Sequence, residues 1–147
     1  MKVYHYTSED GLKGIQSSMM IHESTDTTKD AMLGYGVYFT TMDPGQHSKE
    51  EILQNNYDSA IRAMHVKRMD YAIEVEIPIG QLKENPGMRN VWVHPGSVYL
   101  NDYPHRFIRV SDDLKKVFEK GSLLRNVFLG GVIVAGVLAL GAVFNWN

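Results

Sequence analysis

An apolar run near the carboxyl end restricts the fold of this chain more than any other stretch of its sequence. The residues from Val127 to Phe144 include no charged or polar side chain. As a helix with a rise of about 1.5 Å per residue, the run spans roughly 27 Å, close to the ~30 Å hydrocarbon thickness of a bilayer. The run therefore predicts a transmembrane anchor within residues 121–147 and a folded domain over residues 1–120. A buried helix or hairpin of that domain is the alternative.

The residues that flank the run predict its orientation. The four basic side chains that precede it are Lys115, Lys116, Lys120 and Arg125, and Asn145, Trp146 and Asn147 follow it. Positively charged flanks favour the cytoplasmic side of a membrane, and tryptophan is common at the interface. We therefore expect a single-pass carboxy-terminal anchor, with the folded domain on the cytoplasmic side.

Composition excludes several classes of protein. The chain has no cysteine, so a disulfide scaffold, thiolate catalysis and cysteine-ligated metals are excluded. A net charge of -2 gives no general attraction for nucleic acid. No histidine pair has the spacing of a helical zinc site, so no metal is expected. Gly34 and Gly36 lack the third glycine of a dinucleotide fingerprint, because Phe39 stands at that position.

Short periodic stretches follow one another irregularly along residues 1–120. Alternation of apolar and polar residues is clearest from Tyr71 to Ile77, where Pro78 ends the pattern. The expected strands are 2–6, 37–41, 71–77, 91–93, 97–100 and 106–110. Residues 23–34 are polar and aperiodic, so we expect a loop there. Strands without regular βαβ order predict an α+β domain with few helices.

Two capping boxes predict where helices begin. Thr7 with Asp10 precedes a short helix whose apolar face carries Leu12 and Ile15, and Ser48 with Glu51 precedes a longer one. The second helix is expected to run for about twenty residues, because apolar residues recur at helical spacing. These residues are Leu53, Tyr57, Ala60, Ile61 and Met64. A further helix is expected from about Asp112 to Glu119.

Taken singly, the polar residues with possible chemical roles all have a structural explanation. His5 lies in a predicted strand, Tyr38 could be a core aromatic, and Asp102 follows an apolar strand where a turn is common. Glu74 and Glu76 share a strand face, which predicts a solvated surface and not a catalytic carboxylate pair. None of these residues identifies a function by itself.

Three segments together resemble a known family. They are His5-Tyr6-Thr7-Ser8 with the helix that follows, Gly34-Tyr35-Gly36-Val37-Tyr38-Phe39-Thr40 after Asp30-Ala31, and Asn90-Val91 to Leu100-Asn101-Asp102. They resemble the ADP-ribosyltransferases of the diphtheria-toxin and poly(ADP-ribose) polymerase type, in the branch named for a His-Tyr-Asp signature. This resemblance implies two small mixed sheets that hold NAD in a cleft.

The resemblance also implies a role for each matching residue. His5 would hydrogen-bond a ribose hydroxyl, the backbone of Tyr6 would hold the nicotinamide amide, and Tyr38 would stack on the nicotinamide ring. Asp102 would contact the nicotinamide ribose and stabilise its developing positive charge. By the same resemblance, His5, Tyr38 and Asp102 would be catalytic, and Thr7 and Gly36 would belong to the NAD-binding set.

The expected activity is transfer of single ADP-ribose units from NAD to an acceptor, which is expected to be a protein. The resemblance implies single units, because an aspartate is one methylene shorter than the glutamate of the polymerising relatives. Two alternatives remain open: an NAD glycohydrolase, with water as the acceptor, and a non-catalytic module that binds ADP-ribose, NAD or a protein. Tyr57 could be a second aromatic over the nicotinamide, although its place in a helical stripe favours the core.

Overall fold

The computed structural model describes residues 1–25, 34–57, 63–87 and 89–110. Met1–Ser111 form one compact unit. Its elements in chain order are β1 (Lys2–Thr7), α1 (Glu9–Ser18), β2 (Met20–Ile21), β3 (Val37–Phe39), α2 (Lys49–Tyr57), α3 (Ala63–Val66), the 3-10 helix η2 (Lys67–Met69), β4 (Tyr71–Glu76), η3 (Ile79–Gln81), β5 (Lys83–Glu84), β6 (Trp92–His94), β7 (Val98–Tyr99), η4 (Leu100–Asp102) and β8 (His105–Arg109).

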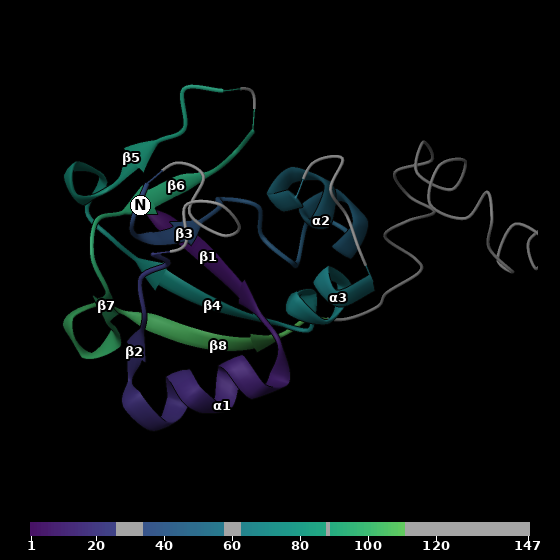
Figure 1. Cartoon of the computed structure of the whole chain (residues 1–147), viewed down its shortest axis with the longest axis horizontal. Helices are drawn as coiled ribbons and strands as arrows, with labels where there is room; N and C mark the ends of the chain where they lie inside the picture. The colour runs from purple at the N-terminus through teal and green to yellow at the C-terminus, as the bar shows by residue number, and fades with distance from the viewer. Residues whose placement is uncertain (26–33, 58–62, 88, 111–147) are drawn as a thin grey trace, which may run out of the picture. The chain divides into compact units, whose positions relative to one another are not determined.

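The described strands form small antiparallel sheets. β1, β4 and β8 lie side by side in that order, β3, β6 and β5 form a second sheet, and β2 pairs with β7 (Figure 1). A bridge between Tyr4 and Thr40 links β1 to the end of β3. The predicted α+β class with few helices is confirmed.

Both faces of the β1-β4-β8 sheet are covered. Val3 packs with Leu12 and Ile15 of α1 on one face. On the other face, Tyr4 and Tyr6 pack with a set of buried residues that includes Ile52, Leu53, Met69 and Ala72. Alternation along β1 thus sends its side chains into two separate cores.

The predicted solvated position of Glu74 is wrong, because Glu74 lies on the sheet face that carries the core of Tyr4 and Tyr6. Glu74 was expected on a solvated face but is only 9% exposed, whereas Glu76 is exposed as expected. Across the strands, Glu74 stands between Tyr4 and Arg106 in register, and Arg106 Nη2 lies 2.8 Å from Glu74 Oε2. A buried carboxylate is stable only when it is paired in this way.

The two predicted helix starts have different outcomes. Ser48 and Glu51 form the capping box: the Ser48 amide donates to Glu51 Oε2 at 2.9 Å, and the Glu51 amide donates to Ser48 Oγ at 3.2 Å. At α1 the cap is Ser8, which accepts from the Gly11 amide, and not Thr7. Thr7 is still paired with Tyr71 in the sheet, so the helix begins one residue later.

Other boundaries differ from expectation. The predicted helix of about twenty residues is described in two pieces, α2 and α3, and residues 58–62 between them lie outside the described residues. The short strands β2 and β5 were not predicted, since two residues are too few for periodicity to show. The predicted helix from Asp112 and the apolar run Val127–Phe144 also lie outside the described residues. Within the described ranges, no helix has the length and apolar character needed to cross a membrane.

Candidate functional site

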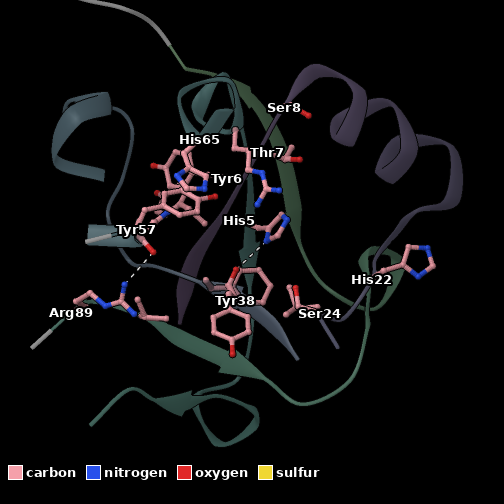
Figure 2. A pocket seen from close by; sticks show the side chains of 16 residues that line it. His5, Tyr6, Thr7, Ser8, His22, Ser24, Tyr38, Tyr57, His65 and Arg89 are labelled. Atoms are coloured by element: carbon pink, nitrogen blue, oxygen red, sulfur yellow. Dashed lines mark hydrogen bonds between the residues drawn. The ribbon is translucent and has the colours of Figure 1, made fainter. Parts of the chain in front are cut away.

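A pocket of about 360 Å³ lies where β1 and β3 separate (Figure 2). The two strands meet at Tyr4 and Thr40, and the residues beyond that bridge line the pocket on both sides. The volume is within the usual range for a small-molecule site. Among the residues predicted to bind NAD, the lining includes His5, Tyr6, Thr7 and Tyr38.

The backbone of Tyr6 presents an open strand edge to the pocket. The Tyr4 amide donates to the Thr40 carbonyl at 2.8 Å, and the Thr40 amide donates to the Tyr4 carbonyl at 3.0 Å. Alternate residues of a strand direct their N–H and C=O groups to the same edge. The Tyr6 groups therefore face the same side, where no backbone group of the described residues bonds them. A donor and an acceptor so placed suit a primary amide.

The proton position of His5 follows from its hydrogen bond to Tyr38. His5 Nδ1 lies 3.0 Å from the carbonyl oxygen of Tyr38, which can only accept, so Nδ1 carries the proton. Burial lowers the pKa of His5 below 6.5, and the bond to Tyr38 opposes that shift only in part. The ring is thus neutral at physiological pH, and Nε2 is an acceptor for a ligand hydroxyl.

Tyr38 is fixed at both its backbone and its side chain. Tyr38 pairs with Val93 in the sheet, and the Tyr38 hydroxyl donates to the Gly34 carbonyl at 2.7 Å. The ring is half-buried and lines the pocket. An aromatic ring held in this way offers a flat surface on which another ring can stack.

Gly36 allows a close backbone contact just before β3, as the glycines beside Tyr35 predict. At a φ of 151°, an added Cβ would lie 2.5 Å from the His94 carbonyl oxygen. Gly36 also bridges Ser24, which lines the pocket, but Gly36 itself is not among the lining residues. Its assignment to the NAD-binding set stays a prediction.

Asp102 is the predicted catalytic residue that the structure does not bring to the pocket. It is the last residue of η4, its side chain is exposed, and it does not line the pocket. η4 is held instead near the end of α1, where the Leu100 amide donates to the Met19 carbonyl at 2.9 Å. Its role also stays a prediction.

The sequence favours a core position for Tyr57. In the structure, its side chain lies between the core and the pocket. The ring packs against the second core and also lines the pocket. It stacks on His65, with ring centroids 4.1 Å apart and planes 6° from parallel. A residue at the edge of a helical stripe can serve both purposes, so spacing alone could not assign it.

Arginine residues at the pocket were missed altogether. Arg68 and Arg89 line it, and Arg89 Nη1 donates to the Asn56 carbonyl at 3.2 Å. Both arginines come from stretches without periodicity, so no local pattern marked them. The described lining holds these two arginines but no carboxylate. The guanidinium groups favour an anionic ligand.

Among the described residues, no group of His, Asp or Glu side chains could hold a metal ion. The site instead combines a fixed aromatic ring, an amide-binding strand edge, a neutral histidine acceptor and cationic side chains. This set can bind a ligand that carries an amide, a sugar hydroxyl and negative charge.

Comparison with known proteins identifies a family. A family model described as "HYD1 signature containing ADP-ribosyltransferase" matches residues 3–102. No curated protein and no solved structure is similar enough to count as a match. The matched range covers more than half of the chain and contains His5, Tyr38 and Asp102. The chain therefore belongs to the family of ADP-ribosyltransferases that carry the HYD1 signature.

Proposed function

We propose that this protein is a mono-ADP-ribosyltransferase that cleaves NAD at the bond between nicotinamide and ribose and transfers ADP-ribose to a protein acceptor. One observation supports the proposal most strongly. The pocket combines the open edge of Tyr6, the acceptor nitrogen of His5 and the ring of Tyr38, which are the three contacts expected for the nicotinamide riboside half of NAD.

Each contact has a complementary group on NAD. The carboxamide would donate to the Tyr6 carbonyl and accept from the Tyr6 amide. The nicotinamide ring would stack on Tyr38, and a ribose hydroxyl would donate to His5 Nε2. Because the backbone and the Tyr38 carbonyl hold these groups in place, the ribose would be ordered before reaction.

The bond that breaks joins C1′ of the ribose to the pyridinium nitrogen. Its electron pair passes to the ring nitrogen, so nicotinamide leaves as a neutral molecule, and C1′ becomes oxocarbenium-like. A carboxylate beside that carbon stabilises the positive charge. We assign this task to Asp102 from the resemblance, supported by a family match that extends to it. Because Asp102 does not line the described pocket, this assignment needs a test of its own.

The test uses the full chain in detergent with NAD labelled in the adenosine half, with and without a protein lysate. A transferase releases nicotinamide and deposits label on protein. Release without labelling would establish a glycohydrolase, and thermal stabilisation by NAD without release would establish a binding module. Asp102→Ala is expected to lose activity and to keep the melting temperature of the wild type.

The proposal includes a single-pass membrane anchor, with the catalytic domain on the cytoplasmic side. Its support is the apolar run Val127–Phe144 and the basic residues that precede it. Attachment would confine ADP-ribose transfer to acceptors near one membrane. Resistance of the bound protein to extraction by alkaline carbonate tests the anchor, and release into the supernatant would contradict it.

A further inference from the structure

Arg89 brings a permanent positive charge to the pocket, and the contacts proposed for nicotinamide riboside do not use it. The side chain is half-buried and lines the pocket on the same side as Tyr57 (Figure 2). Its Nη1 donates to the Asn56 carbonyl at 3.2 Å, which holds the side chain but neutralises no charge. Among the described residues, no carboxylate forms a salt bridge with it. The guanidinium therefore keeps charge and hydrogen-bond donors for a ligand.

The charge of NAD is unevenly distributed. Its diphosphate is negative and its nicotinamide ring is positive, so a guanidinium attracts the first and repels the second, whichever way the dinucleotide lies. The described lining adds the guanidinium of Arg68, and it contains no carboxylate that would oppose the attraction. Hydrogen bonds from arginine to phosphate are charge-assisted, and partial burial strengthens them. The diphosphate is thus the part of NAD that Arg89 is suited to bind.

The size of the pocket allows this contact together with the others. Arg89, His5 and Tyr38 all line one pocket of about 360 Å³. In NAD the diphosphate is joined directly to the nicotinamide ribose. A ligand whose nicotinamide riboside half contacts His5 and Tyr38 can therefore bring its diphosphate to the same pocket.

Hydrogen bonds of Asn90 hold the segment that carries Arg89. The Asn90 amide donates to Asn55 Oδ1, and Asn55 Nδ2 donates to the Asn90 carbonyl, both at 2.8 Å. Asn90 Nδ2 donates to Thr41 Oγ1 at 2.7 Å, and the Thr41 amide donates to Asn90 Oδ1 at 3.1 Å. Asn55, Asn90 and Thr41 do not line the pocket, but each lies within two residues of one that does. These bonds tie residue 90 to α2 and to the chain after β3, so the backbone beside Arg89 is placed before a ligand binds.

We infer that Arg89 binds the diphosphate of NAD, and that Asn55, Asn90 and Thr41 are positioning residues that act through it. This inference rests on the proposed function and assigns a partner to the charged centre of the substrate. A side chain that is held in place before binding loses less conformational entropy when the ligand arrives. The positioning residues therefore contribute to affinity without touching NAD.

The experiment is calorimetry on the full chain in detergent with NAD, ADP-ribose and nicotinamide riboside. The first two ligands carry the diphosphate and the third does not. Arg89→Gln should raise the Kd for NAD and for ADP-ribose roughly 10- to 100-fold, the loss expected for a hydrogen bond to a charged group. The Kd for nicotinamide riboside should change less than about twofold, within the variation of surface substitutions. Arg89→Lys should restore part of the lost affinity, because it keeps the charge and loses the planar fork.

Arg109→Gln controls for the change in net charge. It removes an exposed arginine of β8 that does not line the pocket. The Kd values for all three ligands should stay those of the wild type. A loss of ADP-ribose affinity equal to that of Arg89→Gln would show that the effect of Arg89 is one of net charge and not of contact, and would overturn the inference.

Thr41 offers a matched pair of variants for the positioning role. Thr41→Val keeps the shape of the side chain and removes the hydroxyl that accepts from Asn90, whereas Thr41→Ser keeps the hydroxyl. Thr41→Val should raise the Kd for ADP-ribose about 2- to 10-fold, as for the loss of one neutral hydrogen bond, and Thr41→Ser should not. In the Arg89→Gln background, Thr41→Val should cause no further loss, because it acts through Arg89. Additive losses would show that Thr41 supports the fold alone.

Other outcomes would overturn the assignment of Arg89. Equal weakening of ADP-ribose and nicotinamide riboside by Arg89→Gln would show that Arg89 does not act on the diphosphate. Unchanged ADP-ribose affinity, or no ADP-ribose binding by the wild type, would exclude the contact. None of these measurements requires turnover. If the wild type releases no nicotinamide but Arg89→Gln still weakens ADP-ribose binding selectively, the proposed transferase activity fails and this inference holds.

Discussion

At the scale of single residues, His5 shows how a histidine in a strand can serve as a ligand-binding group. Taken alone, the sequence around His5 favours a structural histidine, because a strand histidine between apolar residues has no distinctive spacing. What the structure adds is the Tyr38 carbonyl 3.0 Å from Nδ1, which fixes the tautomer and leaves Nε2 as an acceptor. The same bond links β1 to β3 beside the pocket.

The lowered pKa of His5 predicts the pH dependence of NAD binding. Because the folded-state pKa lies below 6.5, affinity should stay constant from mildly alkaline pH down to that value and fall only on further acidification, as Nε2 gains a proton. Folding stability should fall in the same window, because the unfolded chain then binds a proton that the folded protein does not. Titration calorimetry across this range tests the prediction, and His5→Gln should lose the acid dependence of binding. A midpoint above 6.5 in the wild type would contradict it.

Gly36 gives a second prediction at this scale. Gly36→Ala should destabilise the domain by about 1–3 kcal/mol, because the position combines a left-handed φ with contact to the His94 carbonyl. Gly14→Ala is the matched control: its Cβ would meet nothing within 4 Å, and alanine favours the interior of α1 by roughly 0.5–1 kcal/mol. Chemical denaturation measures both. Equal effects of the two substitutions would show that β3 tolerates a side chain at residue 36.

At the scale of elements, the sequence predicted those features that depend on local pattern. The strand from Tyr71 and the capping box at Ser48 were found because alternation and capping act over a few residues. The buried state of Glu74 depends on α2, which lies far away in sequence and covers the second sheet face. Arg89 likewise lines the pocket beside Asn90, whose hydrogen bonds to Asn55 and Thr41 are long-range contacts with no local sequence pattern.

The Glu74 site predicts how the central sheet responds to acid. Burial alone would raise the pKa of Glu74, but hydrogen bonds from Arg106 and Tyr4 outweigh it and hold the pKa below 4.5. The stability that this carboxylate contributes is present above 4.5 and is lost as pH falls through the lowered pKa. Glu74→Gln should therefore cost about 1–3 kcal/mol at neutral pH and flatten the loss of stability in acid. Glu76→Gln, at an exposed position on the same strand, should change little. Equal acid sensitivity of Glu74→Gln and the wild type would contradict the prediction.

At the scale of the whole molecule, the proposed anchor determines where the pocket can act. A charged residue at the centre of a membrane helix costs about 2.5–3.5 kcal/mol on insertion. Val134→Arg should therefore shift the protein from the membrane to the soluble fraction, while the rate of nicotinamide release in detergent stays that of the wild type. Val134→Leu is the control and should remain bound. Fractionation of cells that express each variant tests this, and membrane retention of Val134→Arg would contradict the proposed anchor.

The central claim is that NAD is cleaved in the pocket between β1 and β3, and the release of nicotinamide by the full chain tests it most directly. Wild type, His5→Ala and Tyr38→Ala would be compared, with thermal melts to show that each variant is folded. The account predicts release by the wild type and its loss in both folded variants. No release by folded wild type, or undiminished release by both variants, would contradict it.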